Sequence, residues 1–339
     1  MRKNNRKAEL TVLSGIAILF VLGIHASAGA MKYYFPSAVG YENTSRLLCT
    51  FFNLVSPAVP IFLFVSGNKY YLNDRDIPYL KYLRKRLPRV LVSFAVINTF
   101  FWLIDAIVWR EQMTPRVLLN SYISSWLGNS VAYQLWYIPM YCFVILVCPL
   151  VNRLVRNSGM RLGIFLAIGL IYKIISMHIP LLQSKPFMFI SYPLFFEMGV
   201  VAAEKNLQER VGSPIMIFGY IVALTGISCI NPALSRNAVF QYLFVNILGT
   251  LVCYHLSIVL AENKVLHWLG TVSYPVFLLH DPVIGQFVSA QFARLAVPAV
   301  WIYLPFWIFL VLISAVCLMK ILEMLHMDRV LWNFRLRNS

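Results

Sequence analysis

Ten long apolar segments recur along this 339-residue chain. Each has about the length that a helix needs to cross a bilayer, which is about 20 residues. Hydrophobic residues make up 60% of the chain and charged residues 12%, and the mean hydropathy is +0.71. These values exclude an ordinary soluble domain, so we expect an all-α fold, a polytopic membrane helix bundle of about ten transmembrane helices. The segments are 10–30, 47–67, 90–109, 135–152, 161–179, 187–203, 213–230, 239–260, 267–288 and 300–321.

The chain carries no internal repeat, flexible linker or appended soluble domain, so residues 1–339 are predicted to form a single membrane domain. The first apolar segment follows a basic N-terminus, as in a secretion signal. It is longer than the apolar part of such a signal and leads directly into further spans, so we interpret it as a mature helix. The apolar stretch 117–127 is too short and too polar for another span, and we interpret it as an interfacial or re-entrant piece.

The distribution of the 29 Lys and Arg residues predicts the orientation. When the ten spans are threaded alternately across the bilayer with the N-terminus inside, 21 basic residues fall on the inner side and seven on the outer side, with Lys173 inside a span. Cytoplasmic loops are enriched in Lys and Arg, so both termini are expected in the cytoplasm, with the chain in the cell membrane. This enrichment also accounts for the net charge of +16, so no nucleic acid partner is implied.

One inner loop is denser in positive charge than topology requires. Residues 69–89 include a cluster at the start of the third span, Lys81, Arg84, Lys85, Arg86 and Arg89. One interpretation is an anchor for anionic membrane lipids. The other is a site for an anionic cytoplasmic ligand, because arginines hold phosphate groups bidentately. The six cysteines are scattered, mostly within apolar spans, and have no His partner at ligand spacing, so neither a disulfide framework nor a metal site is predicted.

Ionisable side chains at membrane depth are costly and mark functional candidates. Those within or at the ends of the predicted spans are His25, Asp105, Lys173, Glu197, His255, His280 and Asp281. At about 1.5 Å per residue, His25 and His280 lie roughly 20 Å from the inner ends of two parallel spans, so the two imidazoles are expected at one level, nearer the outer face. For His25 three interpretations remain open: a hydrogen-bonded core residue, a general base, and a proton relay in transport.

Six short motifs follow one another over nearly the whole chain. They are segment 10–26, which ends in Ile-His25-Ala, then Pro60-Ile-Phe-Leu-Phe-Val-Ser66-Gly67, Arg86-Leu-Pro-Arg89, Trp136-Tyr-Ile, Phe195-Phe-Glu-Met-Gly199 and Ser273-Tyr274-Pro-Val-Phe-Leu-Leu-His280. In this order and topology the chain resembles the acyltransferase-3 family, ten-helix membrane proteins that O-acylate cell-surface sugars.

The chain departs from the family pattern at Ser14, where an arginine is expected ten intervening residues before the histidine. Serine supplies no positive charge to an anionic donor or a developing oxyanion. Three explanations are open: Arg86 and Arg89 compensate, the donor differs, or acyl transfer has been lost.

The resemblance implies a membrane O-acyltransferase, with acetyl as the expected group. It would move an acyl group from cytoplasmic acyl-CoA to a hydroxyl of a surface or lipid-linked glycan, without a metal. The residues it suggests are His25 and His280 for catalysis, Arg84, Lys85, Arg86 and Arg89 for the donor, and Ser66, Glu197, Tyr274 and Trp136 for the substrate. The alternative is a transporter or exporter of a surface polymer or small metabolite on the same fold, which Ser14, Lys173 and Glu197 favour.

Overall fold

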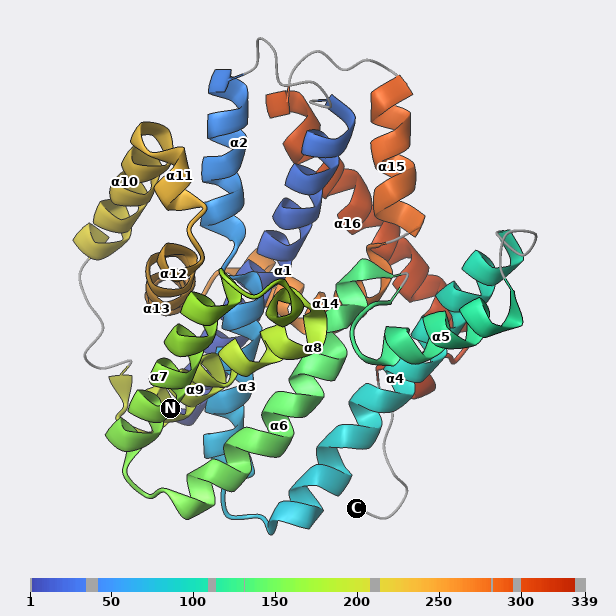
Figure 1. Ribbon diagram of the computed structural model, residues 1–339. Helices are drawn as coiled ribbons and strands as arrows, with labels where there is room; N and C mark the ends of the chain where they lie inside the picture. Colours follow the sequence, from blue (N-terminus) through green and yellow to red (C-terminus); the bar gives the residue numbers. More distant parts are fainter. Residues whose placement is uncertain are drawn as a thin grey trace.

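The computed structural model describes residues 2–34, 42–108, 114–130, 132–207, 214–281, 283–294 and 300–332, and every regular element in these ranges is helical. The longer helices are α1 (Arg2–Tyr34), α2 (Glu42–Val55), α3 (Ala58–Asn73), α4 (Tyr79–Val108), α6 (Tyr137–Leu154), α7 (Ser158–Ser176), α10 (Pro214–Ile230), α14 (Lys264–Leu279) and α16 (Val300–Met324). The shorter ones are α5 (Pro115–Trp126), α8 (Lys185–Met188), α9 (Pro193–Glu204), α11 (Pro232–Ser235), α12 (Ala238–Phe240), α13 (Gly249–Val259), α15 (Val283–Arg294) and α17 (Asp328–Leu331). Figure 1 shows them gathered into one bundle.

The structure confirms the predicted all-α polytopic bundle. Within the described ranges, eight helical stretches are long and apolar enough to cross a membrane. The two remaining predicted spans are also helical but differ from a full-length crossing. The span 213–230 corresponds to α10, whose apolar part Ile215–Ile230 is shorter, and the span 267–288 is divided between α14 and α15. The division falls directly after Leu279, where two polar residues interrupt the apolar run.

The predicted short piece at 117–127 forms a separate helix, α5, which is too short for a crossing. Thr114 precedes it in extended conformation, and its side chain accepts a hydrogen bond from the backbone N–H of Val117. Such a bond satisfies one of the free donors at a helix start. Polar contacts hold α5 against α4, including the bond from the Asn98 amide to the Ser125 hydroxyl at 2.7 Å.

Helix α1 runs through the interior and packs against α3, α13, α14 and α16. Its crossing with α14 is very close, because a Cβ on Gly15 would lie 2.1 Å from the Leu266 carbonyl oxygen and one on Gly270 would lie 1.8 Å from that of Thr11. Small residues allow helix backbones to approach in this way in membranes. Any larger side chain at either position would push the two helices apart.

The crossing of α3 with α9 uses the same device. A Cβ on Gly67 would lie 1.9 Å from the Phe196 carbonyl oxygen, and one on Gly199 would lie 1.9 Å from that of Phe64. In each crossing the residue just before a glycine is a serine, Ser14 in α1 and Ser66 in α3. Because the glycine occupies the helix contact, the adjacent serine faces a different direction and is available to line a cavity.

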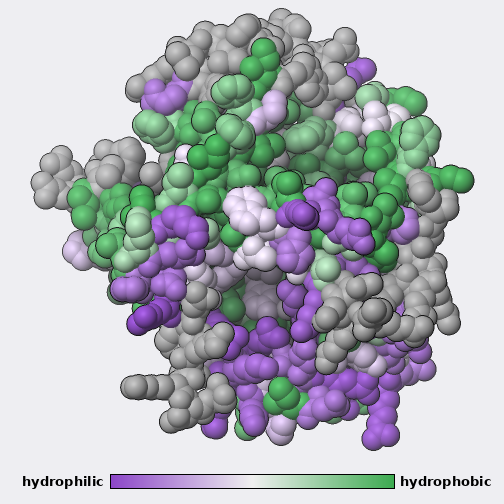
Figure 2. Space-filling view, turned by 180° about the vertical axis from the view of Figure 1, so that it is seen from behind, coloured by the Kyte–Doolittle hydropathy of each residue, from purple (hydrophilic) through white to green (hydrophobic). Residues whose placement is uncertain are grey.

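Lys and Arg side chains gather at one end of the bundle, which we call the basic end. It contains the turn 74–78 between α3 and α4, the turn 155–157 between α6 and α7, and the start of α1. All three lie in the lower half of Figure 1. In Figure 2 hydrophilic side chains gather in the lower part of the opposite face, whereas hydrophobic side chains cover much of the part above. Hydrophilic side chains are therefore concentrated toward the basic end and hydrophobic side chains toward the part above it.

Candidate functional site

The structure brings His25 and His280 side by side. The ring of His25, on α1, lies 4.8 Å from that of His280, and the two ring planes meet at 79°. His280 directly follows the last residue of α14 and is fully buried. The depths read from the sequence predicted this shared level. The side chain of His25 remains 16% exposed, so the pair has a path to solvent.

The end of α14 sets the tautomer of His280. Its Nδ1 atom lies 2.9 Å from the carbonyl oxygen of Phe277 and 3.2 Å from that of Val276. A carbonyl oxygen only accepts hydrogen bonds, so Nδ1 of the neutral ring carries the proton. The other nitrogen, Nε2, is buried and has no hydrogen-bond partner among the described residues. His280 therefore presents an acceptor atom whose partner is missing.

Asp281 adds a carboxylate to this pair. One of its oxygens lies 3.9 Å from Nδ1 of His25. The amide of Gln134, in the short helical turn Tyr133–Trp136, donates to the backbone carbonyl of Asp281. The side-chain oxygen of Gln134 is buried without a partner among the described residues. A carboxylate on the Nδ1 side of an imidazole orients the ring so that its Nε2 can take a proton.

An aromatic pair beside His25 holds a lysine. The ammonium of Lys185 lies 4.4 Å from the ring centre of Tyr133 and 4.8 Å from that of Trp136, and it donates a 3.1 Å hydrogen bond to the Tyr133 hydroxyl. The Tyr133 ring lies 6.4 Å from that of His25. Cation–π contacts of this length are attractive. Trp136, a predicted substrate residue, is thus part of this cluster, which we call the lysine cage.

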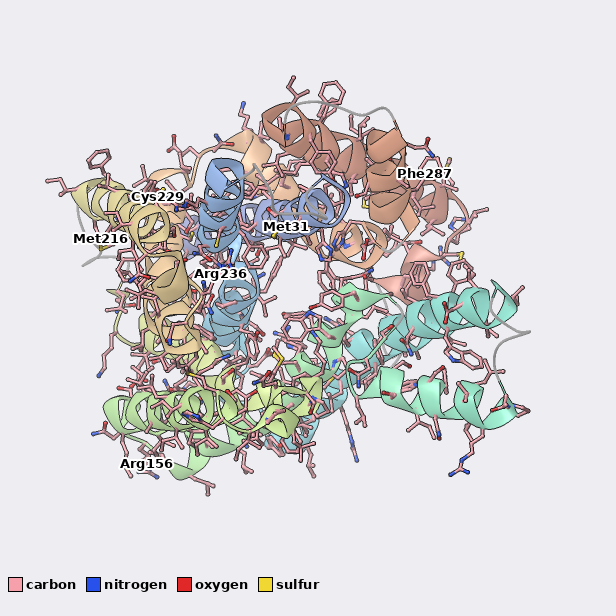
Figure 3. All side chains as sticks on the ribbon, turned by 45° about the horizontal axis from the view of Figure 1, so that its top comes forward. Met31, Arg156, Met216, Cys229, Arg236 and Phe287 are labelled. Atoms are coloured by element: carbon pink, nitrogen blue, oxygen red, sulfur yellow. The ribbon has the colours of Figure 1, made fainter. Side chains whose placement is uncertain are left out.

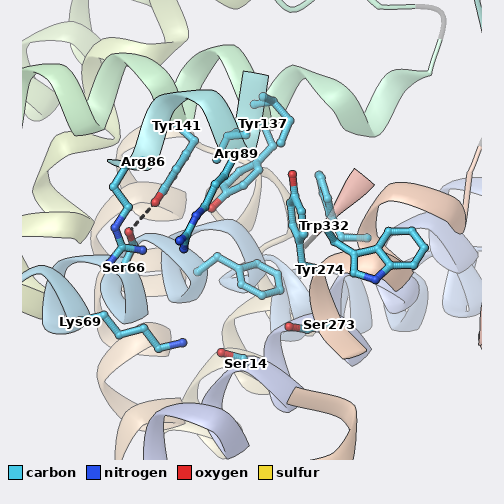
Figure 4. Close-up of a pocket in the computed structure, with 14 residues that line it drawn as sticks. Ser14, Ser66, Lys69, Arg86, Arg89, Tyr137, Tyr141, Ser273, Tyr274 and Trp332 are labelled. Atoms are coloured by element: carbon cyan, nitrogen blue, oxygen red, sulfur yellow. Dashed lines mark hydrogen bonds between the residues drawn. The ribbon is translucent and has the colours of Figure 1, made fainter. Parts of the chain in front are cut away.

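A cavity of about 280 Å³ lies on the basic-end side of the histidine pair. Helices α1, α3, α4, α6 and α14 supply most of its walls, as Figure 4 shows. Its lining contains the predicted residues Ser66, Arg86, Arg89 and Tyr274, together with Ser14 at the departure from the family pattern. The remaining lining residues are Phe62, Lys69, Val90, Tyr137, Ile138, Tyr141, Ser273, Phe277 and Trp332. We call this space the central cavity.

The cations of the central cavity differ in their partners. Asp74 binds both Lys85, at 2.7 Å, and Arg86, through hydrogen bonds from Nε and Nη2. Burial of Asp74 disfavours its charged form, but these hydrogen bonds prevail and hold its pKa below the ordinary value. The ammonium of Lys69 and the guanidinium of Arg89 have no ion-pair or hydrogen-bond partner among the described residues. In Figure 4 both point into the space that Ser14 faces.

The hydroxyl groups of the cavity are partly engaged. Ser14 donates a 2.9 Å hydrogen bond to the backbone carbonyl of Leu10. The hydroxyl proton is therefore used within α1 and does not reach across the cavity. The oxygens of Ser66 and Tyr141 lie 2.9 Å apart. Positive charge in the region of Ser14 is supplied by Lys69, which lies three residues beyond Ser66 on α3.

A single layer of aromatic residues separates the central cavity from the histidine pair. Phe277 lines the cavity, its ring lies 6.1 Å from that of His280, and its carbonyl oxygen accepts from the same histidine. The ring of Tyr137, also in the lining, lies 5.3 Å from that of Phe277. The cavity thus reaches from the cationic groups to the wall of the histidine site.

The structure does not bring every predicted residue to this site. Glu197 is fully buried and binds Arg161 at 2.6 Å and Asn152 at 2.7 Å, so it joins α9 to α7 and α6. It lines neither the central cavity nor the histidine pair. Arg84 is exposed and Lys85 is held by Asp74, and neither lines the cavity.

Sequence reasoning left Lys69, Gln134, Lys185 and the role of Asp281 unassigned. Lys69 was counted only as a topology charge, although its spacing of three from Ser66 puts both on one helix face. Asp281 stood out as an acid next to His280, without a partner to define its role. Gln134 and Lys185 carry no signal in the sequence, because only the fold brings them to His25.

Comparison with known proteins identifies the class. The family model described as Acyltransferase domain matches residues 7–321, nearly the whole chain. The bundle is therefore that of a membrane-embedded acyltransferase. The chain belongs to the acyltransferase-3 family, as its ordered motifs indicated. No curated protein and no solved structure gave a match.

Proposed function

We propose that this acyltransferase takes an acyl group, acetyl in the simplest case, from acyl-CoA at the basic end and passes it to a hydroxyl of a surface or lipid-linked glycan at the opposite side. The basic end faces the cytoplasm in this proposal, because Lys and Arg concentrate on that side of membrane proteins. The membrane is the cell membrane.

One observation carries the proposal: two cations that lack an ion-pair partner among the described residues, Lys69 and Arg89, share a cavity whose inner wall contacts His280. Lys69 is exposed and Arg89 is partly exposed, so an incoming anion can reach both charges. Phosphate is a strong partner for such groups. At about 280 Å³ the cavity is at the small end of ligand sites, so it suits the acyl-bearing arm of the donor, with the phosphates at its cationic mouth.

The histidine site supports the chemical step. Asp281 lies 3.9 Å from Nδ1 of His25, so its charge favours a proton on that nitrogen and leaves Nε2 to accept the proton of the acceptor hydroxyl. The hydroxyl oxygen then forms a bond to the acyl carbon, the carbon–sulfur bond breaks, and the departing sulfur takes a proton from His25. Because Nδ1 of His280 is committed to backbone carbonyls, its Nε2 accepts a hydrogen bond and so holds a second hydroxyl of the acceptor in place.

This route also accounts for Ser14. The charge that an arginine would supply there is provided by Lys69, from the neighbouring helix, into the same cavity. The proposal therefore needs neither a different donor nor loss of acyl transfer.

Binding of acetyl-CoA to the purified full-length protein tests the donor site by isothermal titration calorimetry. We expect Lys69→Gln and Arg89→Gln each to weaken binding by about tenfold or more, since each removes a charged phosphate contact. Arg84→Gln removes the same charge from the basic end but outside the cavity, and should change affinity less than about twofold. Equal affinity of all three variants and the wild type would overturn the donor assignment.

The acceptor is tested by mass spectrometry of surface glycans from cells with and without the gene. The proposal expects an O-acyl group that disappears with the gene. Identical glycans would show that the acceptor belongs to another chemical class.

A further inference from the structure

A second cavity of about 430 Å³ opens at the basic end, on another face of α3. Whereas the central cavity meets α3 at Ser66 and Lys69, this one meets it at Tyr70 and Tyr71. Its lining is dominated by four arginines, with two acidic side chains. The lining residues are Tyr70, Tyr71, Arg75, Asp76, Asn152, Arg153, Arg156, Arg161 and Glu204. We call it the arginine cavity.

Arg161 is engaged by two carboxylates, so this part of the arginine cavity carries no net positive charge. It binds Glu197 at 2.6 Å and Glu204 at 2.8 Å, and its third nitrogen donates to the carbonyl oxygens of Val155 and Arg156. With two carboxylates around one guanidinium, this group has no positive charge left for a ligand. Its role is to hold α6, α7 and α9 together.

The other three arginines keep their charge. The guanidinium of Arg156 has no hydrogen-bond or ion-pair partner in the part of the chain that the structure describes. Arg153 donates to the backbone carbonyl of Ile77 and lies 5.7 Å from the ring centre of Tyr79, and both are neutral partners. Arg75 lies 4.7 Å from the ring centre of Tyr71.

Of the two carboxylates that line the cavity, Glu204 binds Arg161 and Asp76 is a weak partner of the other arginines. Asp76 lies 3.7 Å from Nε of Arg75, and its side chain is 98% exposed. Water screens an ion pair of that kind almost completely. Three exposed guanidinium groups therefore line one polar cavity without a close carboxylate partner among the described residues, and an anion bound there would relieve their mutual repulsion.

We propose that the arginine cavity binds a phosphate ester, as a second anion site separated from the central cavity by α3. Arginine forks bind phosphate oxygens through paired, charge-assisted hydrogen bonds. The tyrosine hydroxyls offer further donors to the same group.

The phosphate has two possible sources with this chemistry, a nucleotide and the headgroup of an anionic phospholipid. Arg156 stands at the periphery of the bundle in Figure 3. Large apolar side chains beside it are exposed, Leu154 at 74% and Met160 at 59%. An exposed apolar rim of this kind is suited to lipid chains, which gives a headgroup direct access, while the volume also admits a nucleotide phosphate.

Titration calorimetry of the purified full-length protein with inorganic pyrophosphate tests the site. Because pyrophosphate also fits the central cavity, each variant is measured in the wild type and in the Arg89→Gln background. We expect Arg156→Gln to weaken binding by about tenfold in both backgrounds. Arg329→Gln, an exposed arginine that lines neither cavity, is the matched control and should change affinity less than about twofold.

Arg75→Gln is a second variant in case Arg156→Gln reduces the yield of folded protein, and it is expected to act in the same direction. Affinities of both variants equal to that of the Arg89→Gln parent would overturn the proposal. So would an absence of saturable pyrophosphate binding in that parent. A purely structural role of Arg156 predicts a lower melting temperature with unchanged affinity, which is also a negative result.

The source is identified by competition in nanodiscs. If a lipid headgroup is the occupant, pyrophosphate affinity at this site falls when phosphatidylglycerol is added to phosphatidylcholine. If a nucleotide is the occupant, adenosine 3′,5′-bisphosphate displaces pyrophosphate in phosphatidylcholine alone. Failure of both competitors would show that no phosphate ester belongs in the cavity.

Discussion

The buried carboxylates Asp74 and Glu197, on the basic-end side, and the buried acceptor atoms of the histidine site differ in their hydrogen-bond partners. Two buried carboxylates on the basic-end side have two partners each at hydrogen-bond distance: Asp74 binds Lys85 and Arg86, and Glu197 binds Arg161 and Asn152. At the histidine site, buried acceptor atoms of His280 and Gln134 have no partner among the described residues. A buried polar atom without a hydrogen bond costs about 1 to 3 kcal/mol.

This difference distinguishes residues that stabilise the fold from residues that act on the substrate. Carboxylates with a full set of partners hold helices together, so their loss is expected to lower stability. Acceptors without partners are tolerated where a substrate completes the hydrogen bonds, so changes there are expected to lower the rate while the fold is retained.

The largest effect is expected for His25→Ala. Removal of a general base lowers a rate by about 10²- to 10⁴-fold, so acylation of the surface glycan, measured by mass spectrometry, should fall to background. The closest charged partner of His25 is 3.9 Å away, so the melting temperature and acetyl-CoA affinity should stay at wild-type values. Glycan acylation at the wild-type level would eliminate His25 as the base.

Arg161→Ala tests the structural side of the comparison. It leaves the fully buried Glu197 without its cationic partner, and breaking such a pair costs about 3 to 5 kcal/mol. A markedly lower melting temperature of the purified protein is expected. The matched control is Arg156→Ala, because the Arg156 guanidinium has no such partner among the described residues and its loss should leave the melting temperature unchanged. Equal melting temperatures for the two variants would show that the Arg161–Glu197 pair does not stabilise the fold.

Asp74→Asn should destabilise the protein by about 1.5 to 3 kcal/mol, the usual range for hydrogen bonds to a charged group. In the folded protein the pKa of Asp74 lies below its ordinary value. In the unfolded chain it returns to about 3.9. The stabilisation is therefore complete above that pH and is lost as the pH falls through the lower, folded-state pKa.

The measurement is the melting temperature of wild type and Asp74→Asn as a function of pH. The gap between the two curves should be constant near neutral pH and narrow below about pH 4. Asp76→Asn changes a carboxylate that is 98% exposed two residues away, and its curve should follow the wild type. A gap that persists at low pH would show that the Asp74 charge does not stabilise the fold.

The smallest effect is expected for Asp281→Asn. An amide still fills the space beside His25 but no longer fixes the imidazole through a charge, so kcat should fall by about tenfold. Acetyl-CoA affinity should not change, because Asp281 does not line the central cavity. Partial recovery of kcat by Asp281→Glu would support a positioning role. A change in affinity with kcat unaltered would contradict it.

The sequence predicted much of the fold, because membrane crossing depends mainly on length and apolar composition. It also predicted that His25 and His280 share a level, since the rise per residue of a helix converts sequence position into depth. The motif pair Ser66-Gly67 illustrates the limit of this reasoning. The motif can be recognised in the sequence. The reason for the glycine cannot, because the Phe196 carbonyl that leaves no room for a side chain there belongs to another helix.

The partners of charged side chains were decided only by tertiary structure. The four basic residues between positions 84 and 89 look alike in the sequence. In the structure Asp74 binds Lys85 and Arg86, whereas Arg84 is exposed and Arg89 faces the central cavity. Glu197 stood out as an intramembrane acid and proved to be a helix-joining residue. Length and apolar composition were enough to predict which residues lie within membrane-spanning helices. The rotation and crossing of the helices decide which charged side chains meet a partner and which face a ligand site. Close backbone contacts between segments far apart in the sequence set that rotation.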